Sequence, residues 1–159
     1  MIKRYDIEKA ISYAQKWALG RNSKYYSFDN VGGDCTNFIS QCLLEGGAEM
    51  DFDKYYGWFY ISAYNRSPSW ASVVYLSRYL LSEKQKGIFA IEQQVNKLQI
   101  GDIIQLKQTN EDFNHSLIIS QKTDSDIYIC AHDNNALNRP LSSYHYIMIR
   151  GIHIEHIIV

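Results

Sequence analysis

The chain has 159 residues, of which 46% are hydrophobic and 21% charged, and its formal net charge is −1; these values are typical of one globular domain, over residues 1–159. The balance of 16 basic and 17 acidic residues, without a basic run, argues against a dedicated nucleic-acid-binding protein. No apolar run reaches the ~20 residues that a membrane-spanning helix requires, and from the first residues we predict no signal peptide.

An amphipathic helix is the first predicted element, over residues 6–18. Its apolar residues recur at helical spacing, Asp6 is placed to cap its N-terminus, and Gly20 is placed to end it. We expect this helix to cover the core. A loop with three aromatic residues is predicted over residues 21–33, and it leads into the segment on which the functional hypothesis depends.

Residues 30–47 predict a buried helix that begins at a cysteine. The segment reads Asn-Val-Gly-Gly-Asp-Cys-Thr-Asn-Phe-Ile-Ser-Gln-Cys-Leu-Leu-Glu-Gly-Gly, in which Asp34 is placed to cap the helix and the last two glycines to end it. A helix N-terminus carries about half a positive charge, which is expected to lower the pKa of the Cys35 thiol from ~8.5 towards neutrality and to favour the reactive thiolate. Cys35 is therefore a candidate nucleophile; the alternative is a small buried cysteine beside an ordinary N-cap.

Residues 50–70 are dense in tyrosine, tryptophan and phenylalanine and show neither a helical nor a strand period. We predict a long loop, which is either a separate aromatic cluster or a wall of the substrate cleft. The candidates for such a wall are Tyr55, Tyr56, Trp58 and Trp70. A helical pattern follows over residues 71–81, and a solvated break over 82–87.

From residue 98 onward the apolar residues recur with a period of two. A turn at 98–102 leads into predicted strands at 103–106, 115–121 and 127–132, followed by a longer β segment over 144–154. Short loops between consecutive strands indicate an antiparallel meander. Because helices come first and strands afterwards, the predicted class is α+β, with N-terminal helices packed on a C-terminal antiparallel sheet.

The strands 115–121 and 127–132 each carry a histidine at the end away from their connecting turn. With a two- or four-residue turn at 122–125, His115 lies directly opposite His132, and both side chains point to the same face of the sheet. A one-residue slip of the register would instead put the two side chains on opposite faces.

A cysteine nucleophile needs a base, and the base needs a third group that fixes its tautomer. We predict Cys35 as nucleophile, His115 as base and His132 as the orienting group, with the backbone N–H of Cys35 as one oxyanion donor. The third role could pass to Asp133 or Asn134, which also follow the strand. The alternative for His115 is a strand-end histidine whose ring is satisfied by the backbone.

Cysteine and histidine side chains also suit zinc, but the sequence has no Cys-x-x-Cys or His-Glu-x-x-His motif, so no metal site and no cofactor are predicted. Cys35 and Cys42 lie roughly 10 Å apart along one helix, too far for a disulfide bond. Cys42 and Cys130 are predicted to be core residues, and no disulfide framework is expected.

Four stretches of the sequence carry a family resemblance. They are Gly-Gly-Asp-Cys-Thr-Asn-Phe-Ile-Ser-Gln at 32–41, Leu-Gln-Ile-Gly-Asp-Ile-Ile at 98–104, His-Ser-Leu-Ile-Ile at 115–119 and Ala-His-Asp at 131–133. These stretches resemble the bacterial putative amidase-domain family, which is related to the NlpC-type and CHAP cell-wall peptidases and amidases within the papain-like superfamily. With further similarity at 13–26, 66–70 and 136–144, the resemblance covers essentially the whole chain.

The resemblance implies a papain-like, NlpC-type cysteine peptidase fold, with Cys35 as nucleophile and His115 as base. His132 matches the polar residue that completes the triad in the NlpC-type relatives. The resemblance also implies a hydrolase that cuts an amide bond of peptidoglycan or another cell-wall peptide through an acyl-thioenzyme, without a cofactor. A secreted or cell-wall-associated location is expected, and the domain can be part of a longer multidomain chain.

Two other functions remain open for the same residues. One is an acyltransferase on the Cys–His scaffold, which would pass the acyl group to an amine or a lipid. The other is an inactive module whose aromatic groove binds cell-wall peptides. Asp34, next to the nucleophile, is counted with the aromatic residues as a candidate substrate contact, although a helix cap explains its position better.

Overall fold

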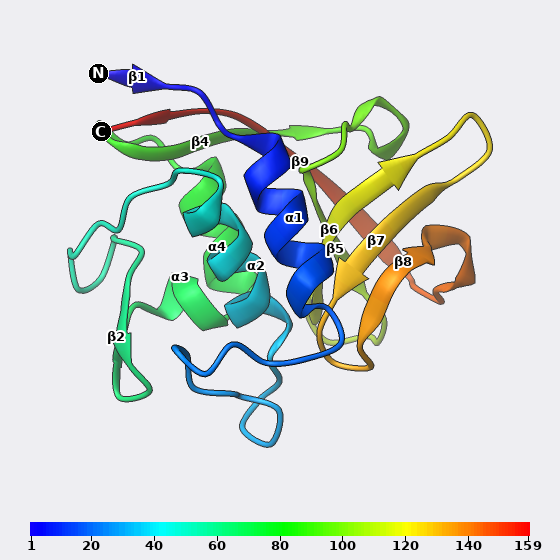
Figure 1. Ribbon diagram of the computed structural model, residues 1–159, viewed down its shortest axis with the longest axis horizontal. Coiled ribbons are helices and arrows are strands. Elements are labelled where there is room, and N and C mark those ends of the chain that lie inside the picture. Colours follow the sequence, from blue (N-terminus) through cyan, green and yellow to red (C-terminus); the bar gives the residue numbers. More distant parts are fainter.

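A seven-stranded antiparallel sheet packs against a layer of helices in the computed structural model, which describes all of residues 1–159 (Figure 1). The helices are α1 (Ile7–Trp17), α2 (Cys35–Glu45), α3 (Pro68–Ala71) and α4 (Val73–Leu81), with 3-10 turns η1 (Val95–Lys97) and η2 (Leu141–Ser143). The large sheet contains β1 (Ile2–Lys3), β4 (Gly87–Gln93), β5 (Ile103–Lys107), β6 (His115–Lys122), β7 (Ile127–Ala131), β8 (Ala136–Pro140) and β9 (Met148–Ile158). β2 (Tyr60–Ser62) and β3 (Asn65–Arg66) form a separate hairpin. None of the helices has the length and apolar character needed to cross a membrane.

The last strand, β9, joins the sheet together. Its first half pairs with β5, and its last residues pair with β1 on the same edge, so the two chain ends lie side by side (Figure 1). Along its other edge β9 pairs with β4, so that Ile152 faces Ile103 of β5 on one side and Glu92 of β4 on the other. From β5 the sheet continues as the meander β5-β6-β7-β8, which confirms the predicted antiparallel order.

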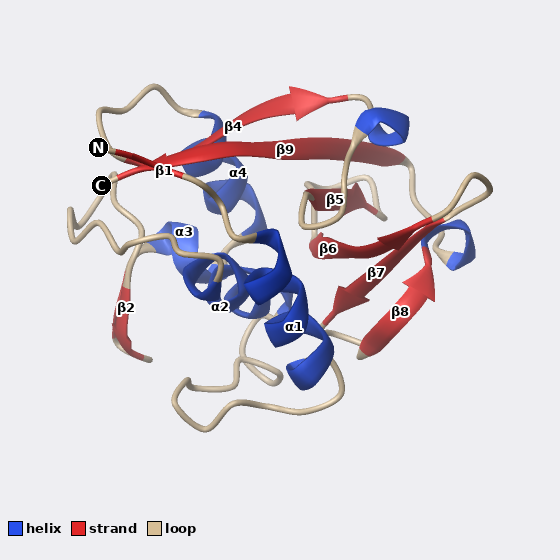
Figure 2. Cartoon of the chain, turned by 45° about the horizontal axis from the view of Figure 1, so that its top comes forward, coloured by secondary structure: helices blue, strands red, loops and turns tan.

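Helix α2 is the buried centre of the helical layer. It packs against α1, α3 and α4 on one side and against β6 and β7 on the other (Figure 2). Every residue from Cys35 to Leu43 is buried. Apolar side chains at helical spacing fill the space between these elements, and buried polar ones find partners: Ser40 donates to the Trp70 carbonyl at 2.8 Å, and Tyr13 donates to Gln41 at 2.5 Å. Such burial fixes the position of the helix N-terminus relative to the sheet.

The sheet is buried on its far face as well. A second apolar cluster, which includes Leu106, Leu117, Ile119 and Ile129, lies on the side away from α2 and is covered by residues around η1 and η2. Strands buried on both faces tolerate little displacement, because every side chain along them is packed. The end of β6 that carries His115 is therefore held in a fixed place.

The predicted helices 6–18 and 71–81 correspond to α1 and to α4 preceded by the short α3. The prediction lacked the short strands β1, β2 and β3 and two longer ones, β4 and β8. In β4 a bulge between Phe89 and Ala90 interrupts the alternation of faces, and in β8 Asn138 has a φ of 52°. The last strand runs from 148 to 158 rather than 144 to 154. Irregular strands hide the period-two signal on which sequence reasoning depends.

Candidate active site

The pairing of β6 with β7 differs by one residue from the predicted register. Ile118 pairs with Cys130 and Ile119 with Ile129, and a bulge follows towards the turn. Continued to the open end of the hairpin, this register brings position 133, and not 132, level with His115. The prediction that His115 lies directly opposite His132 is therefore wrong. Because neighbouring residues of a strand point to opposite faces, the shift also puts the two histidine side chains on opposite faces of the sheet.

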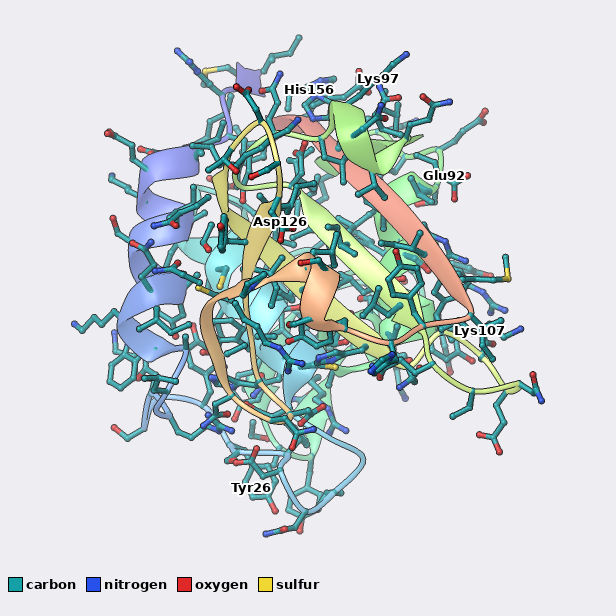
Figure 3. The ribbon with its side chains drawn as sticks, turned by 90° about the vertical axis from the view of Figure 1, so that its right-hand side faces the viewer. Tyr26, Glu92, Lys97, Lys107, Asp126 and His156 are labelled. Carbon is teal, nitrogen blue, oxygen red and sulfur yellow. The ribbon has the colours of Figure 1, made fainter.

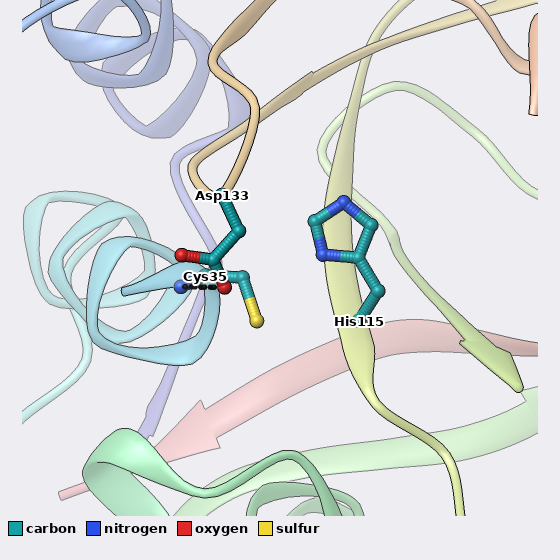
Figure 4. Close-up of side chains that lie close together, drawn as sticks. All are labelled: Cys35, His115 and Asp133. Carbon is teal, nitrogen blue, oxygen red and sulfur yellow. Dashed lines mark hydrogen bonds between the residues drawn. The ribbon is translucent and has the colours of Figure 1, made fainter. Parts of the chain in front are cut away.

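Cys35, the first residue of α2, lies between the helical layer and β6. Its Sγ atom, a ring nitrogen of His115 and a carboxylate oxygen of Asp133 all lie within 4.8 Å of one another (Figure 4). Other polar neighbours of the thiol include the hydroxyl of Thr36 at 3.8 Å, the carbonyl oxygen of Asn114 at 4.0 Å and the backbone of Ser116. The structure thus brings together the predicted nucleophile and the predicted base, with an acid beside both.

Asp133 caps helix α2 from a distant part of the chain. Its carboxylate accepts the backbone N–H of Asp34 at 2.7 Å and that of Cys35 at 3.3 Å. Asp133 and Asn134 have φ values of 63° and 65°, so the chain turns sharply where β7 ends. A Cβ atom on Gly33 would lie 2.5 Å from the Asp133 carboxylate, which explains the need for glycine before the helix.

The thiol pKa is raised in this setting, and not lowered as the helix N-terminus alone predicts. Burial and, after it, the negative charge of Asp133 raise the pKa of Cys35 to about 12. The carboxylate of Asp133 already lies at the positive end of the helix, so the helix dipole stabilises the Cys35 thiolate only weakly. Burial lowers the pKa of His115 to about 4. Around neutral pH the resting pair is therefore a thiol and a neutral imidazole.

His132 faces away from the thiol, into the helical layer. Its Nδ1 atom lies 2.5 Å from a carboxylate oxygen of Asp34, its Nε2 atom lies 2.8 Å from the Trp17 carbonyl oxygen, and its ring stacks on Phe38. The structure does not bring His132 to the His115 ring. Of the alternatives for the third position, it is Asp133 that lies beside the pair.

Asp34 binds its neighbours instead of capping its own helix. Its side chain makes no cap hydrogen bond; besides His132 it accepts the backbone N–H of Phe28 at 2.8 Å and the side-chain amide of Asn37 at 2.9 Å. The side chain is 1% exposed. Asp34 therefore holds the loop before α2, the helix and the end of β7 together, and it does not face a cavity.

The four aromatic residues predicted as substrate walls lie elsewhere. Trp58 and Trp70 have no exposed surface and donate their indole N–H groups to Ser40 and Asn37 of α2. Tyr55 and Tyr56 project into solvent from the loop before β2, with 76% and 86% of their surface exposed. The structure places none of these four beside His115, because the 50–70 segment packs behind α2.

A pocket of about 350 Å³ opens onto His115 and Asp133. Its other walls are mostly polar side chains and come from the loop before β6 and the segment from 134 to 145: Gln108, Asn114, Asn134, Arg139, Ser143, Tyr144 and His145. Sequence reasoning did not single out Arg139 or Tyr144 as site residues. The signal was present, since both lie in the 136–144 stretch that carries part of the family resemblance.

The cluster of Cys35, His115 and Asp133 is also where this chain could hold a metal ion. Sulfur, imidazole and carboxylate are donors that zinc takes, and three protein ligands with one open position are typical of catalytic zinc. Both oxygens of Asp133 already accept backbone N–H groups. Each of these oxygens keeps a second lone pair, so the geometry supports a cysteine–histidine pair and is also compatible with a metal ion.

Residues 4–155 match the model of a family described as "Putative amidase domain". The chain is also similar to two Bacillus subtilis (strain 168) proteins that are named as uncharacterized. It is 34% identical to YhbB over 123 residues, which are 75% of this chain and 38% of that protein. It is 26% identical to YjcM over 147 residues, which are 87% of this chain and 33% of that protein. The chain therefore spans about a third of the length of these curated relatives. No solved structure matches it.

Proposed function

The chain belongs to the putative amidase-domain family, and from this premise we propose that it hydrolyses amide bonds with Cys35 as the nucleophile and His115 as the general base and acid. The observation that carries the proposal is the cysteine at the start of a buried helix with a histidine nitrogen and a carboxylate within 4.8 Å (Figure 4). The family description supports a hydrolase of amides. The cysteine mechanism rests on the geometry of these side chains.

In the first half-reaction His115 removes the proton from the Cys35 thiol as the sulfur attacks the substrate carbonyl carbon. A neutral imidazole is the form that can accept this proton, and its low pKa keeps it neutral above about pH 4. The new C–S bond converts the carbonyl to an oxyanion. When the oxyanion collapses, the C–N bond breaks, His115 gives its proton to the leaving amine, and a thioester remains on Cys35.

In the second half-reaction water replaces the amine. His115 takes a proton from the water as its oxygen attacks the thioester carbon. The C–S bond then breaks, the acid product leaves, and the thiolate recovers the proton from His115. Each proton moves only between His115 and a group in reach of the pocket, so the reaction requires no cofactor.

The oxyanion needs a donor, and the nearest is the backbone N–H of Cys35. In this structure that N–H donates to Asp133 at 3.3 Å, a longer bond than the 2.7 Å bond from Asp34. A substrate carbonyl oxygen therefore competes with the Asp133 carboxylate for the weaker of two donors. We expect Asp133 to keep its bond to the Asp34 N–H and to release that of Cys35 when substrate binds.

A papain-like fold, a cell-wall peptide as substrate and a secreted location belong to the same proposal. The fold is supported by a buried helix that begins at Cys35 and packs on an antiparallel sheet whose strand β6 begins at His115. A peptide-like substrate is supported by the polar lining of the pocket. The same lining favours water over a lipid as the acyl acceptor, which makes hydrolysis a better explanation than acyl transfer.

Alkylation of Cys35 by iodoacetamide tests the proposal without a known substrate. The rate at Cys35 is followed by peptide mass spectrometry from pH 6 to 10, with EDTA present so that zinc cannot mask the thiol. We expect His115→Ala to slow the reaction at pH 7.5 by about tenfold or more, since general-base assistance is typically worth 10²–10⁴-fold.

His156→Gln is the matched control. His156 stacks on Phe89. Tyr26 lies near Cys35, because its carbonyl oxygen accepts a hydrogen bond from Asn37 in the first turn of α2. His156 lies at the other end of the molecule from Tyr26 (Figure 3). Its substitution is expected to leave the rate unchanged. A Cys35 thiol that reacts equally well with and without His115 would overturn the proposed nucleophile and favour an inactive binding module.

A further inference from the structure

Arg139 lies in the pocket of His115 and has no acidic partner. Two other partly buried arginines form ion pairs, Arg21 with Asp29 at 2.7 Å and Arg150 with Glu92 at 3.5 Å. Arg139 instead donates through Nε to the Ser143 hydroxyl at 2.7 Å and through Nη2 to the Ser143 carbonyl at 3.2 Å. Its Nη1 group makes no hydrogen bond, so a positioned cation keeps free donors towards the pocket.

Tyr144 supplies a second unused donor in the same place. Its hydroxyl is the one buried side-chain nitrogen or oxygen of the chain that has no hydrogen-bond partner, which is unfavourable unless something else satisfies it. The guanidinium carbon of Arg139 lies 3.8 Å from the centre of the Tyr144 ring. That ring in turn lies 5.9 Å from the ring of His115. The two unused donors therefore lie next to each other and next to the proposed base.

We propose that Arg139 and Tyr144 bind a carboxylate of the substrate, so that the enzyme acts on amides with a free carboxylate close to the scissile bond. This inference rests on the proposed function and adds the substrate class. A carboxylate accepts both from a guanidinium and from a hydroxyl, and a guanidinium held in a fixed orientation loses little freedom on binding.

The acid in the same pocket does not cancel this attraction. The Asp133 carboxylate forms no ion pair with Arg139, since the two groups lie more than 4 Å apart. Asp133 instead accepts hydrogen bonds from the backbone N–H groups at the start of α2. Of the other lining residues, only His115, Tyr144 and His145 carry ionisable side chains, and none of these is a permanent cation. Arg139 is therefore the one permanent positive charge on the wall of the pocket.

The test compares iodoacetate with iodoacetamide, which differ by one negative charge. Both lose iodide as the Cys35 sulfur displaces it and forms a thioether, and the thiol proton passes to solvent through His115. The two rates at Cys35 are measured at pH 8.5 and low salt by peptide mass spectrometry. Their ratio is independent of any change in thiol reactivity that affects both reagents equally. Asp133 repels iodoacetate in every variant and therefore does not affect the comparison.

We expect Arg139→Gln to lower the iodoacetate-to-iodoacetamide ratio by about threefold or more, which is within the range measured for partly exposed charge pairs. Arg139→Lys keeps the charge without the fork of donors and is expected to lower the ratio less. Tyr144→Phe removes only the unpartnered hydroxyl and is expected to lower the ratio as well. Arg78→Gln is the matched control, since Arg78 is exposed on α4 and stacks on Tyr75.

The outcomes separate this inference from the proposed function. If Cys35 reacts with both reagents and the ratio is unchanged by the Arg139 and Tyr144 substitutions, the carboxylate site is overturned and the amidase proposal stays intact. If Cys35 reacts with neither reagent, the proposal that Cys35 is the nucleophile is overturned, and with it the proposed substrate class. If Arg139→Gln fails to fold in a thermal melt, Arg139→Lys and Tyr144→Phe decide the question by the same ratio.

Discussion

His115 and His132 lie at the same end of neighbouring strands and are 5% and 1% exposed, yet their rings have opposite surroundings. Both ring nitrogens of His132 face acceptors, from Asp34 and Trp17. The ring of His115 makes no hydrogen bond to the chain and lines a pocket beside Cys35. Burial and position in the sequence therefore do not separate a structural histidine from a candidate base. The set of partners does, since a ring with two bonds to the chain has no free nitrogen for a substrate proton.

The comparison predicts that His132 contributes more than His115 to the free energy of unfolding. In His132→Ala the buried carboxylate of Asp34 loses its nearest hydrogen-bond partner and a cavity is left beside Phe38, which together cost about 3–5 kcal/mol. For a chain of this size we expect the melting temperature to fall by roughly 10 °C. A calorimetric or circular-dichroism melt measures the change.

His145→Ala provides the control for this prediction, because His145 is exposed at the rim of the pocket, and surface substitutions usually change stability by less than about 0.5 kcal/mol. A melting temperature that falls no further in His132→Ala than in His145→Ala would contradict the structural role. The proposed base behaves in the opposite way, since His115→Ala is expected to change Cys35 reactivity far more than stability.

The second prediction concerns acid, and it follows from the burial of His115. Its pKa is about 4 in the folded protein and ~6.5 in an unfolded chain, so the unfolded state binds more protons between these values. Stability is therefore fully present above about pH 6.5 and falls as the pH drops towards 4, by up to about 3 kcal/mol. Denaturant titrations of wild type and His115→Gln at several pH values measure this slope.

Because other groups also titrate in this range, the difference between the two proteins is the informative quantity. In His115→Gln the stability curve is expected to be flatter between pH 6.5 and 4 than in the wild type. Parallel curves would show that the His115 ring is already charged, or reaches water, at these pH values. In that case it would resemble an ordinary surface histidine and not the neutral base of the proposed mechanism.

The smallest predicted effect concerns Asp133, the residue that follows His132. Asp133→Asn removes the charge that, after burial, raises the pKa of Cys35. We expect that pKa to fall and alkylation of Cys35 at pH 8 to become up to about tenfold faster, which corresponds to one pKa unit. Asp124→Asn, in the turn between β6 and β7, is the matched control. An unchanged rate would mean that burial alone keeps the thiol protonated.

Local pattern was sufficient for much of the chain. The start of a buried helix at Cys35, its end at two glycines, and the order of β5, β6 and β7 follow from residue spacing and turn residues alone. These features depend on neighbours within a few positions of the sequence. The same is true of the resemblance to the putative amidase-domain family, whose model matches residues 4–155.

The aromatic segment shows where local pattern is insufficient. Trp58 and Tyr55 are three residues apart in a stretch without a clear period, and one is fully buried while the other is 76% exposed. Only the packing of Trp58 against α2 and Trp70 separates them. A segment of this composition suits a core and a cleft wall equally well, so its sequence cannot choose between them.

The sequence by itself determined the nucleophile candidate, the base candidate and the class of fold, because each depends on short-range spacing. Only the tertiary structure decided which acid meets them and how the thiol ionises. The one-residue shift between β6 and β7 puts Asp133 on the side of Cys35 and turns His132 away. Asp133 is 98 residues from Cys35 along the chain, and its charge offsets the helix dipole that local reasoning relied on. Register and long-range charge are properties of the folded chain, so they cannot be read from either segment alone.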